Sequence, residues 1–166
     1  MLRKNHILIF FCTLLLSVNS VFAQRDSIGK AYALIQDQDM AVETRVKQAR
    51  EAIDKFILNA QSEKDPCAWF VRGYIYKEWY KTFDSKNKKA TSRLDAVAFL
   101  KKALELDTSN GKPFSYTATF MYTGKVATIS LDFDQKAIKN ILKYFGSTFY
   151  NDAGSLLDKT NYPTAI

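Results

Sequence analysis

Apolar residues recur at helical spacing along most of the chain. Two such runs, separated by a polar turn, predict a helical hairpin over about 24–60. Asp65 and Pro66 then suit the start of a new helix. Apolar side chains occupy several sides of the segment that follows, so this helix should be sandwiched between neighbours. A further helix is predicted at about 92–106.

The period changes in residues 112–133, where apolar and small polar residues alternate until Gly124 interrupts them. This alternation favours a β-hairpin at about 113–133, with an irregular helix as the alternative. A lone two-stranded ribbon is marginally stable, so it should lie against the helices. The helical period returns in 134–166, and Asp134 is well placed to cap that helix.

Six residues in 66–107 fall at a spacing that resembles the tetratricopeptide repeat (TPR). They are Trp69, Gly73 and Tyr76 in the first helix, and Ala96, Leu100 and Ala103 in the second. The resemblance implies an all-α fold of antiparallel helical hairpins that form a short right-handed superhelix, with the β-hairpin as an insertion. Residues 24–60 would then be a degenerate or capping hairpin, and 66–107 the best-matching repeat.

Residues 134–166 resemble the repeat more weakly, with Phe149 and Ala153 in place of Trp and Gly. The second helix would only begin near Ala165. We therefore expect an incomplete further repeat, and the apolar side of Phe149 could drive self-association.

The first 23 residues have the layout of a secretory signal peptide. Arg3 and Lys4 precede an apolar run, and Ala23 supplies a small residue before Gln24. The alternative, a retained membrane anchor, fits less well because the run is shorter than the roughly 20 residues that span a bilayer. We expect cleavage after 1–23, no membrane span afterwards, and a domain at 24–166 in the bacterial periplasm or outside the cell.

The chain has 24 Lys and Arg, 17 Asp and Glu, and a formal net charge of +7. Loss of the leader would leave about +5. An exported location makes nucleic acid a poor candidate partner, and leaves acidic proteins, anionic lipids or acidic glycans. The basic segment 81–93 is interpreted as a solvated loop. Residues 81–91 exceed the length of the compact repeat, so they either lengthen both helices or form a protruding basic loop.

Little catalytic chemistry remains after cleavage. The leader contains His6, the only histidine, and Cys12, so Cys67 would be the single thiol. We interpret Cys67 as a small packed residue. The sequence predicts no catalytic residues, no metal site and no cofactor, and hence a protein that is not an enzyme.

The candidate partner groove consists of Phe70, Tyr74 and Lys77, with Tyr150 one repeat later. In TPR proteins these positions face the concave surface, which implies a scaffold that binds a protein or peptide. The alternative is that the rings pack against the preceding hairpin.

Two other functions remain open. Exposed rings at Trp79 or Tyr80 would favour a carbohydrate or cell-wall binding module. A histidine-independent hydrolase would need acidic or nucleophilic side chains that converge in a pocket.

Overall fold

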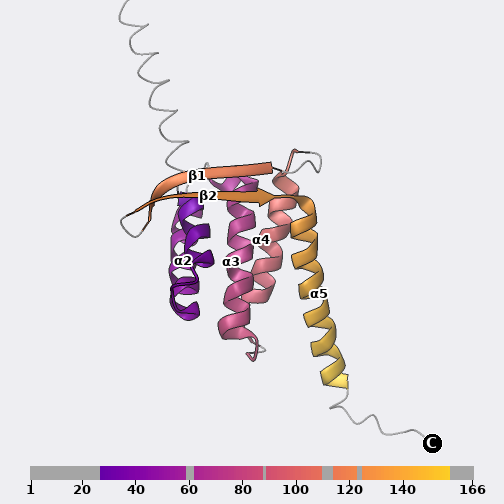
Figure 1. The fold of residues 1–166 in the computed structure, drawn as a ribbon. Coiled ribbons are helices and arrows are strands. Elements are labelled where there is room, and N and C mark those ends of the chain that lie inside the picture. The colour runs from indigo at the N-terminus through magenta and orange to yellow at the C-terminus, as the bar shows by residue number, and fades with distance from the viewer. Residues whose placement is uncertain (1–26, 59–61, 88, 110–113, 123–124, 158–166) are drawn as a thin grey trace, which may run out of the picture.

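The computed structural model describes residues 27–58, 62–87, 89–109, 114–122 and 125–157 (Figure 1). Within these residues the protein is mostly helical, and one β-hairpin lies across one end of the helices. The predicted signal peptide and the end of the predicted incomplete repeat lie outside the described residues.

The helices follow one another along the chain as side-by-side rods (Figure 1). Residues 27–36 are helical. They are followed by α2 (Val42–Ile57), the short η1 (Ser62–Lys64), α3 (Pro66–Trp79), η2 (Tyr80–Asp84), α4 (Ser92–Leu106) and α5 (Gln135–Leu157).

The helical hairpin predicted at 24–60 is present in the described part of that range. Its two helices bury Ile28, Ala31 and Ile35 on one side and Val46, Ala49, Ile53 and Ile57 on the other. Arg45 donates from Nη1 to the carbonyl oxygen of Asp37 at 2.9 Å, which closes the turn between them. The apolar spacing therefore placed both helices correctly.

The start of α3 follows from two adjacent residues. The side chain of Asp65 accepts a hydrogen bond from the amide of Cys67 at 2.8 Å, and Pro66 occupies the first turn, where its missing N–H costs nothing. Cys67 is 1% exposed, so it packs in the core as expected.

Helices α3 and α4 approach each other closely at Gly73. A Cβ built there would lie 2.7 Å from Cγ of Leu100 and 3.3 Å from the carbonyl oxygen of Ala96. Nearby, the ring of Phe99 lies 5.6 Å from that of Trp69 and contacts that of Tyr76 edge-on at 4.9 Å. The glycine is required here because its missing side chain makes room for Leu100.

The two helices run antiparallel. Trp69, early in α3, contacts Phe99 in the middle of α4, whereas Tyr80, just after α3, meets Arg93 at the start of α4. Ala96, Leu100 and Ala103 are all fully buried. The predicted helical pair at 66–107 is thus present.

The segment between α3 and α4 is not entirely a loop. Residues Tyr80–Asp84 continue α3 as a π-helix, η2. The indole Nε1 of Trp79 donates to Asp84 at 3.1 Å across this turn. Lys81 and Lys86 are exposed, in keeping with a solvated basic segment, but Arg93 is held in an internal cluster described below.

Residues Phe114–Tyr122 (β1) and Lys125–Phe133 (β2) form the predicted hairpin. The strands are antiparallel and pair Tyr116 with Leu131 and Thr117 with Ser130. Leu131 is 3% exposed, while Thr117 and Ser130 are exposed. The hairpin therefore has a covered face and a solvated face, as the alternating sequence requires.

Helix α5 begins at the predicted cap, since Asp134 accepts a hydrogen bond from the amide of Ala137. Ile138 and Phe145 are its fully buried anchors. Arg93 of α4 reaches across to α5 and forms an ion pair with Asp152 at 2.7 Å.

The same guanidinium stacks on Phe149, with its Cζ 3.9 Å from the ring centroid. Phe149 was expected to be an uncovered apolar residue. It is partly buried and packed against the core.

Candidate functional site

One face of α3 and η2 carries four interacting polar side chains: Tyr74, Lys77, Glu78 and Lys81. The ammonium of Lys77 lies 2.7 Å from Oε1 of Glu78, and that of Lys81 lies 3.2 Å from Oε2. Lys77 also sits over the Tyr74 ring, 4.2 Å from its centroid. One carboxylate is thus shared by two lysines, so the cluster keeps a net positive charge.

A shallow depression opens beside these lysines, between α3–η2 and α5. Its volume is about 250 Å³, and it is lined by Lys77, Lys81, Asn140, Ile141 and Tyr144. Tyr144 is 39% exposed. We call the four polar residues above, together with Asn140, Ile141 and Tyr144, the α3–α5 groove.

At the edge of this polar face that is farther from α5, Tyr74 of α3 contacts the helix at 27–36. The rings of Tyr32 and Tyr74 lie 5.9 Å apart, and Gln36 donates from Nε2 to the Tyr74 hydroxyl at 3.3 Å. Phe70 is 4% exposed. Tyr74 therefore packs toward the first hairpin, in keeping with the alternative interpretation, and the buried ring of Phe70 lies 6.4 Å from that of Tyr74.

A second cavity, of about 120 Å³, lies where that helix, α2 and α3 meet. Gln36, Arg45, Tyr74 and Glu78 are among its lining residues. The polar surface of α3 is therefore flanked by hollows on both sides.

Of the four residues predicted from the sequence, the structure brings Phe70, Tyr74 and Lys77 together on α3. Tyr150 lies on α5, is 79% exposed, and lines a separate open depression with Lys143 and other residues.

The sequence reasoning missed Asn140, Ile141 and Tyr144. A usable signal existed, because Asn140 and Tyr144 are four residues apart and so share one face of a helix.

Electrostatics fix the charge states in the groove. Burial of Glu78 would raise its pKa, but its ion pairs with Lys77 and Lys81 outweigh this effect and hold the pKa below its ordinary value. Burial is also the main cause that raises the pKa of Tyr144. The groove thus presents the Glu78 carboxylate, paired with Lys77 and Lys81, and the neutral phenol of Tyr144, which suit hydrogen bonding and ion pairing.

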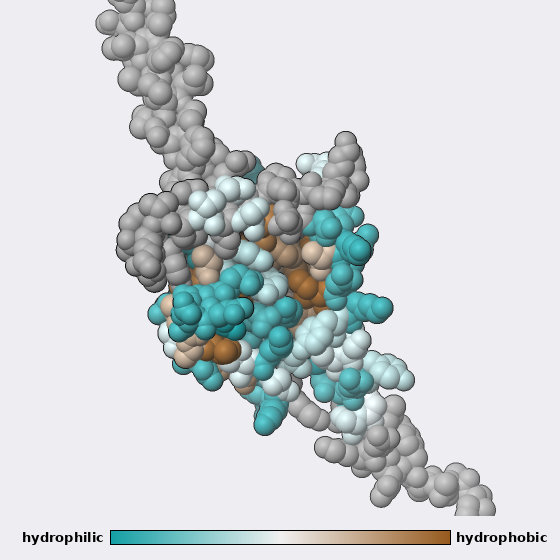
Figure 2. Space-filling model, viewed as in Figure 1, coloured by the Kyte–Doolittle hydropathy of each residue, from teal (hydrophilic) through white to brown (hydrophobic). Residues whose placement is uncertain are grey.

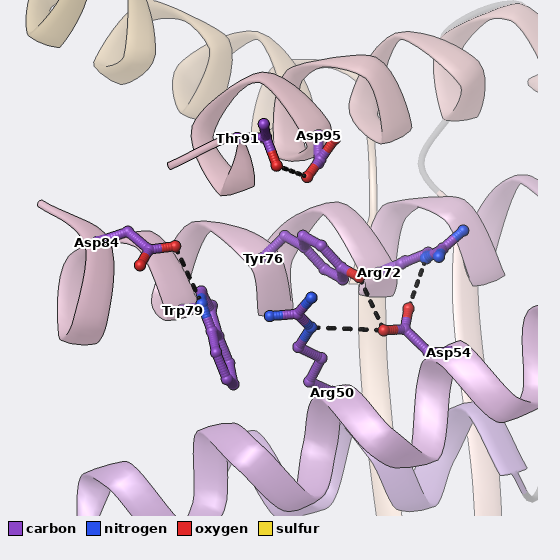
Figure 3. A network of polar contacts seen from close by, with 8 residues as sticks. All are labelled: Arg50, Asp54, Arg72, Tyr76, Trp79, Asp84, Thr91 and Asp95. Atoms are coloured by element: carbon purple, nitrogen blue, oxygen red, sulfur yellow. Dashed lines mark hydrogen bonds and ion pairs between the residues drawn. The ribbon is translucent and has the colours of Figure 1, made fainter. Parts of the chain in front are cut away.

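A different polar network joins α2 to the opposite side of α3 (Figure 3). Asp54 accepts hydrogen bonds from Nε of Arg72 at 2.8 Å and from the hydroxyl of Tyr76 at 2.7 Å, and Arg50 lies 3.5 Å from the same carboxylate. Burial and the Asp54 bond raise the pKa of Tyr76. Because these donors occupy the carboxylate, the network serves chiefly to hold the helices together.

The same region bears on the carbohydrate alternative. Arg50 covers Trp79, with its Cζ 4.1 Å from the ring centroid, and Tyr80 is 9% exposed. Tyr80 therefore offers no open face. Trp79 is half-buried and lines an open depression of about 360 Å³, but Arg50 lies over its ring and the Phe83 ring is 4.6 Å away.

Over the face shown in Figure 2, hydrophilic residues surround smaller apolar patches. Among the described residues, no helix combines the length and apolar content needed to cross a bilayer. The described residues also contain no group of three or more potential metal-ligating His, Cys, Asp or Glu side chains. No protein-family model matches the chain, and no curated protein or solved structure matches it significantly.

Proposed function

We propose that this chain is an exported, non-catalytic scaffold of TPR-like type that binds a protein or peptide through the α3–α5 groove. The observation that carries the proposal is the depression of about 250 Å³ in which Lys77 and Lys81 face Ile141 and Tyr144. A mixed cationic and apolar hollow between two helices suits a peptide that supplies both an acidic and an apolar side chain.

The contacts between successive helices support the repeat-like arrangement. Helix α3 packs against both α2 and α4. The first helix of each proposed hairpin also contacts the first helix of the next one. Tyr32 of the helix at 27–36 contacts Tyr74 of α3, and Tyr80 of η2, which continues α3, lies 6.0 Å from the ring of Phe145 of α5. In this proposal each hairpin adds to the last, and the stack curves into a short right-handed superhelix.

The charge of the groove favours an acidic partner. Lys77 and Lys81 share the carboxylate of Glu78. Lys139 and Lys143 of α5, which lie beside Asn140 and Tyr144 in the sequence, are exposed. Rim charges of this kind mainly accelerate association and select partners of opposite sign. Binding should therefore weaken as salt increases.

Selection from a displayed peptide library, followed by titration of the selected peptide, tests this proposal. We expect acidic peptides with an aromatic or aliphatic residue, and about tenfold weaker binding to Lys81→Glu and to Tyr144→Ala. Lys102→Glu is the matched control, because Lys102 is an exposed lysine of α4. Equal losses in Lys81→Glu and Lys102→Glu, or selection of peptides without acidic residues, would contradict the proposed groove.

The proposed export has its own test. Mass spectrometry of the protein recovered from a secreting bacterial host should give Gln24 as the first residue. A chain that retains residues 1–23 would contradict the proposed cleavage.

A further inference from the structure

The outer edge of the β-hairpin is a potential pairing surface. Within the described residues the sheet has two strands, and β2 is the strand paired with β1. In Figure 1, β1 runs along the outer border of the described residues, with β2 on the side of the helices. An edge strand has a row of backbone N–H and C=O groups that can accept another strand.

The sequence of β1 carries none of the usual protections of an edge. Its nine residues include no charged residue and no proline, whereas β2 contains Lys125 and Asp132. Charged residues and proline are the devices by which natural edge strands avoid pairing. The β1 edge is therefore the better candidate for strand addition.

The order of residues in β1 identifies the strand that would fit. The strand reads almost the same in both directions about Ala118. In an antiparallel pair of two β1 strands centred there, aromatic residues would fall opposite aromatic residues, and threonine opposite threonine. The pairs would be Phe114 with Tyr122, Tyr116 with Phe120, and Thr117 with Thr119.

Such matched cross-strand pairs stabilise antiparallel sheets. With a two-fold axis at Ala118, the residue numbers of each pair differ by an even number. Residues an even number of positions apart lie on the same face of a strand, so the solvated faces of the two hairpins lie on the same side of the four-stranded sheet. We propose that two copies of this chain associate through their β1 edges into a continuous four-stranded antiparallel sheet.

The hairpin geometry is compatible with this axis. Two residues separate Tyr122 from Lys125, and the last pair of such a tight hairpin normally exchanges both backbone hydrogen bonds. Since the pattern alternates, Thr117 and Thr119 direct their backbone groups outward. Ala118 then forms a non-hydrogen-bonded pair with its copy, the type in which the Cα atoms are closest, at about 4.5 Å.

Concentration-dependent sedimentation tests the dimer. A single strand edge gives a small interface, so we expect weak, reversible association of the wild-type chain. Thr117→Lys should weaken it by about tenfold, because a lysine on an edge strand opposes pairing.

Ser130→Lys is the matched control. Ser130 is the cross-strand partner of Thr117 and is also exposed, but it belongs to β2, so this variant should associate as the wild type does. A wild-type chain that stays monomeric at millimolar concentration overturns the proposal. So does equal association of the two lysine variants, or association that survives Thr117→Lys and disappears in Tyr150→Lys on α5.

A disulfide test reports the register directly. Ala118→Cys should form a covalent dimer under mild oxidation, because the two-fold axis places the two cysteines opposite each other. Thr128→Cys is an exposed control on β2, and the wild type controls for the natural cysteines. Cross-linking of Ala118→Cys no faster than that of Thr128→Cys would overturn the proposed axis.

Discussion

The α3–α4 contact and the attachment of α5 are built by opposite means. At Gly73 the helices are so close that a Cβ would overlap the buried Leu100 side chain. Around a Cβ at Gly146 of α5, no heavy atom of the described residues lies within 4 Å. Helix α5 is instead held at separate points, chiefly the buried Ile138 and Phe145 and the contacts of Arg93 with Phe149 and Asp152. A change in the first region should affect the whole fold, and a change in the second only one helix.

Substitution of Gly73 should have the largest effect. Gly73→Leu overpacks the α3–α4 contact and should lower the free energy of unfolding by about 1–3 kcal/mol, although about 1 kcal/mol of helix propensity is regained. Thermal melts would measure it, with Gly146→Leu as the same exchange at an open site. A Gly73→Leu variant at least as stable as the wild type would show that the close approach is wrong.

Removal of the Arg93 guanidinium should have a smaller and local effect. Arg93→Met keeps much of the aliphatic bulk but loses the ion pair with Asp152, which is 46% exposed, so we expect a loss of about 1 kcal/mol. Hydrogen exchange should accelerate in α5 near residues 145–155 and remain unchanged in α3. Lys102→Met, on the same helix, is the control; uniform acceleration across all helices would contradict a local role.

The smallest effect should have the opposite sign. Gly146→Ala adds a methyl group where there is space and reduces the freedom of the unfolded chain, so it should stabilise by about 0.5–1 kcal/mol. Urea denaturation of the wild type and the variant would measure this. Destabilisation by Gly146→Ala would mean that α5 is covered at this position, and the contrast with Gly73 would no longer hold.

The helices and strands that could be predicted from the sequence are those in which apolar residues recur at a single clear spacing. The alternation in 113–133 predicted the hairpin, and the spacing of Ala96, Leu100 and Ala103 predicted the buried face of α4. A longer helix was one of the two interpretations of 81–91, but the π-helical form of Tyr80–Asp84 was not predictable. The indole of Trp79 donates to Asp84 across this turn, a local arrangement that the apolar pattern does not encode.

The site was harder to predict because it depends on which helices become neighbours. Lys77 was identified from its place on α3, but its neighbours Asn140 and Tyr144 lie more than sixty residues away in the sequence. The link between Arg93 and Asp152 spans 59 residues, and Arg93 was assigned to a basic loop. The apolar period of a segment indicates which face of its helix is buried, but it does not indicate which other helix packs against that face.

The arginine contacts show that the net charge of this chain is not its available charge. The four arginines among the described residues are each engaged internally: Arg45 with a backbone carbonyl, and Arg50, Arg72 and Arg93 with aromatic rings and carboxylates. A planar guanidinium can stack flat on an aromatic ring and bond a carboxylate at the same time, whereas the compact ammonium group of a lysine has no flat face to stack. The charge that a partner meets is therefore mainly that of the lysines, whose ammonium groups acetylation can neutralise without disturbing the arginine contacts.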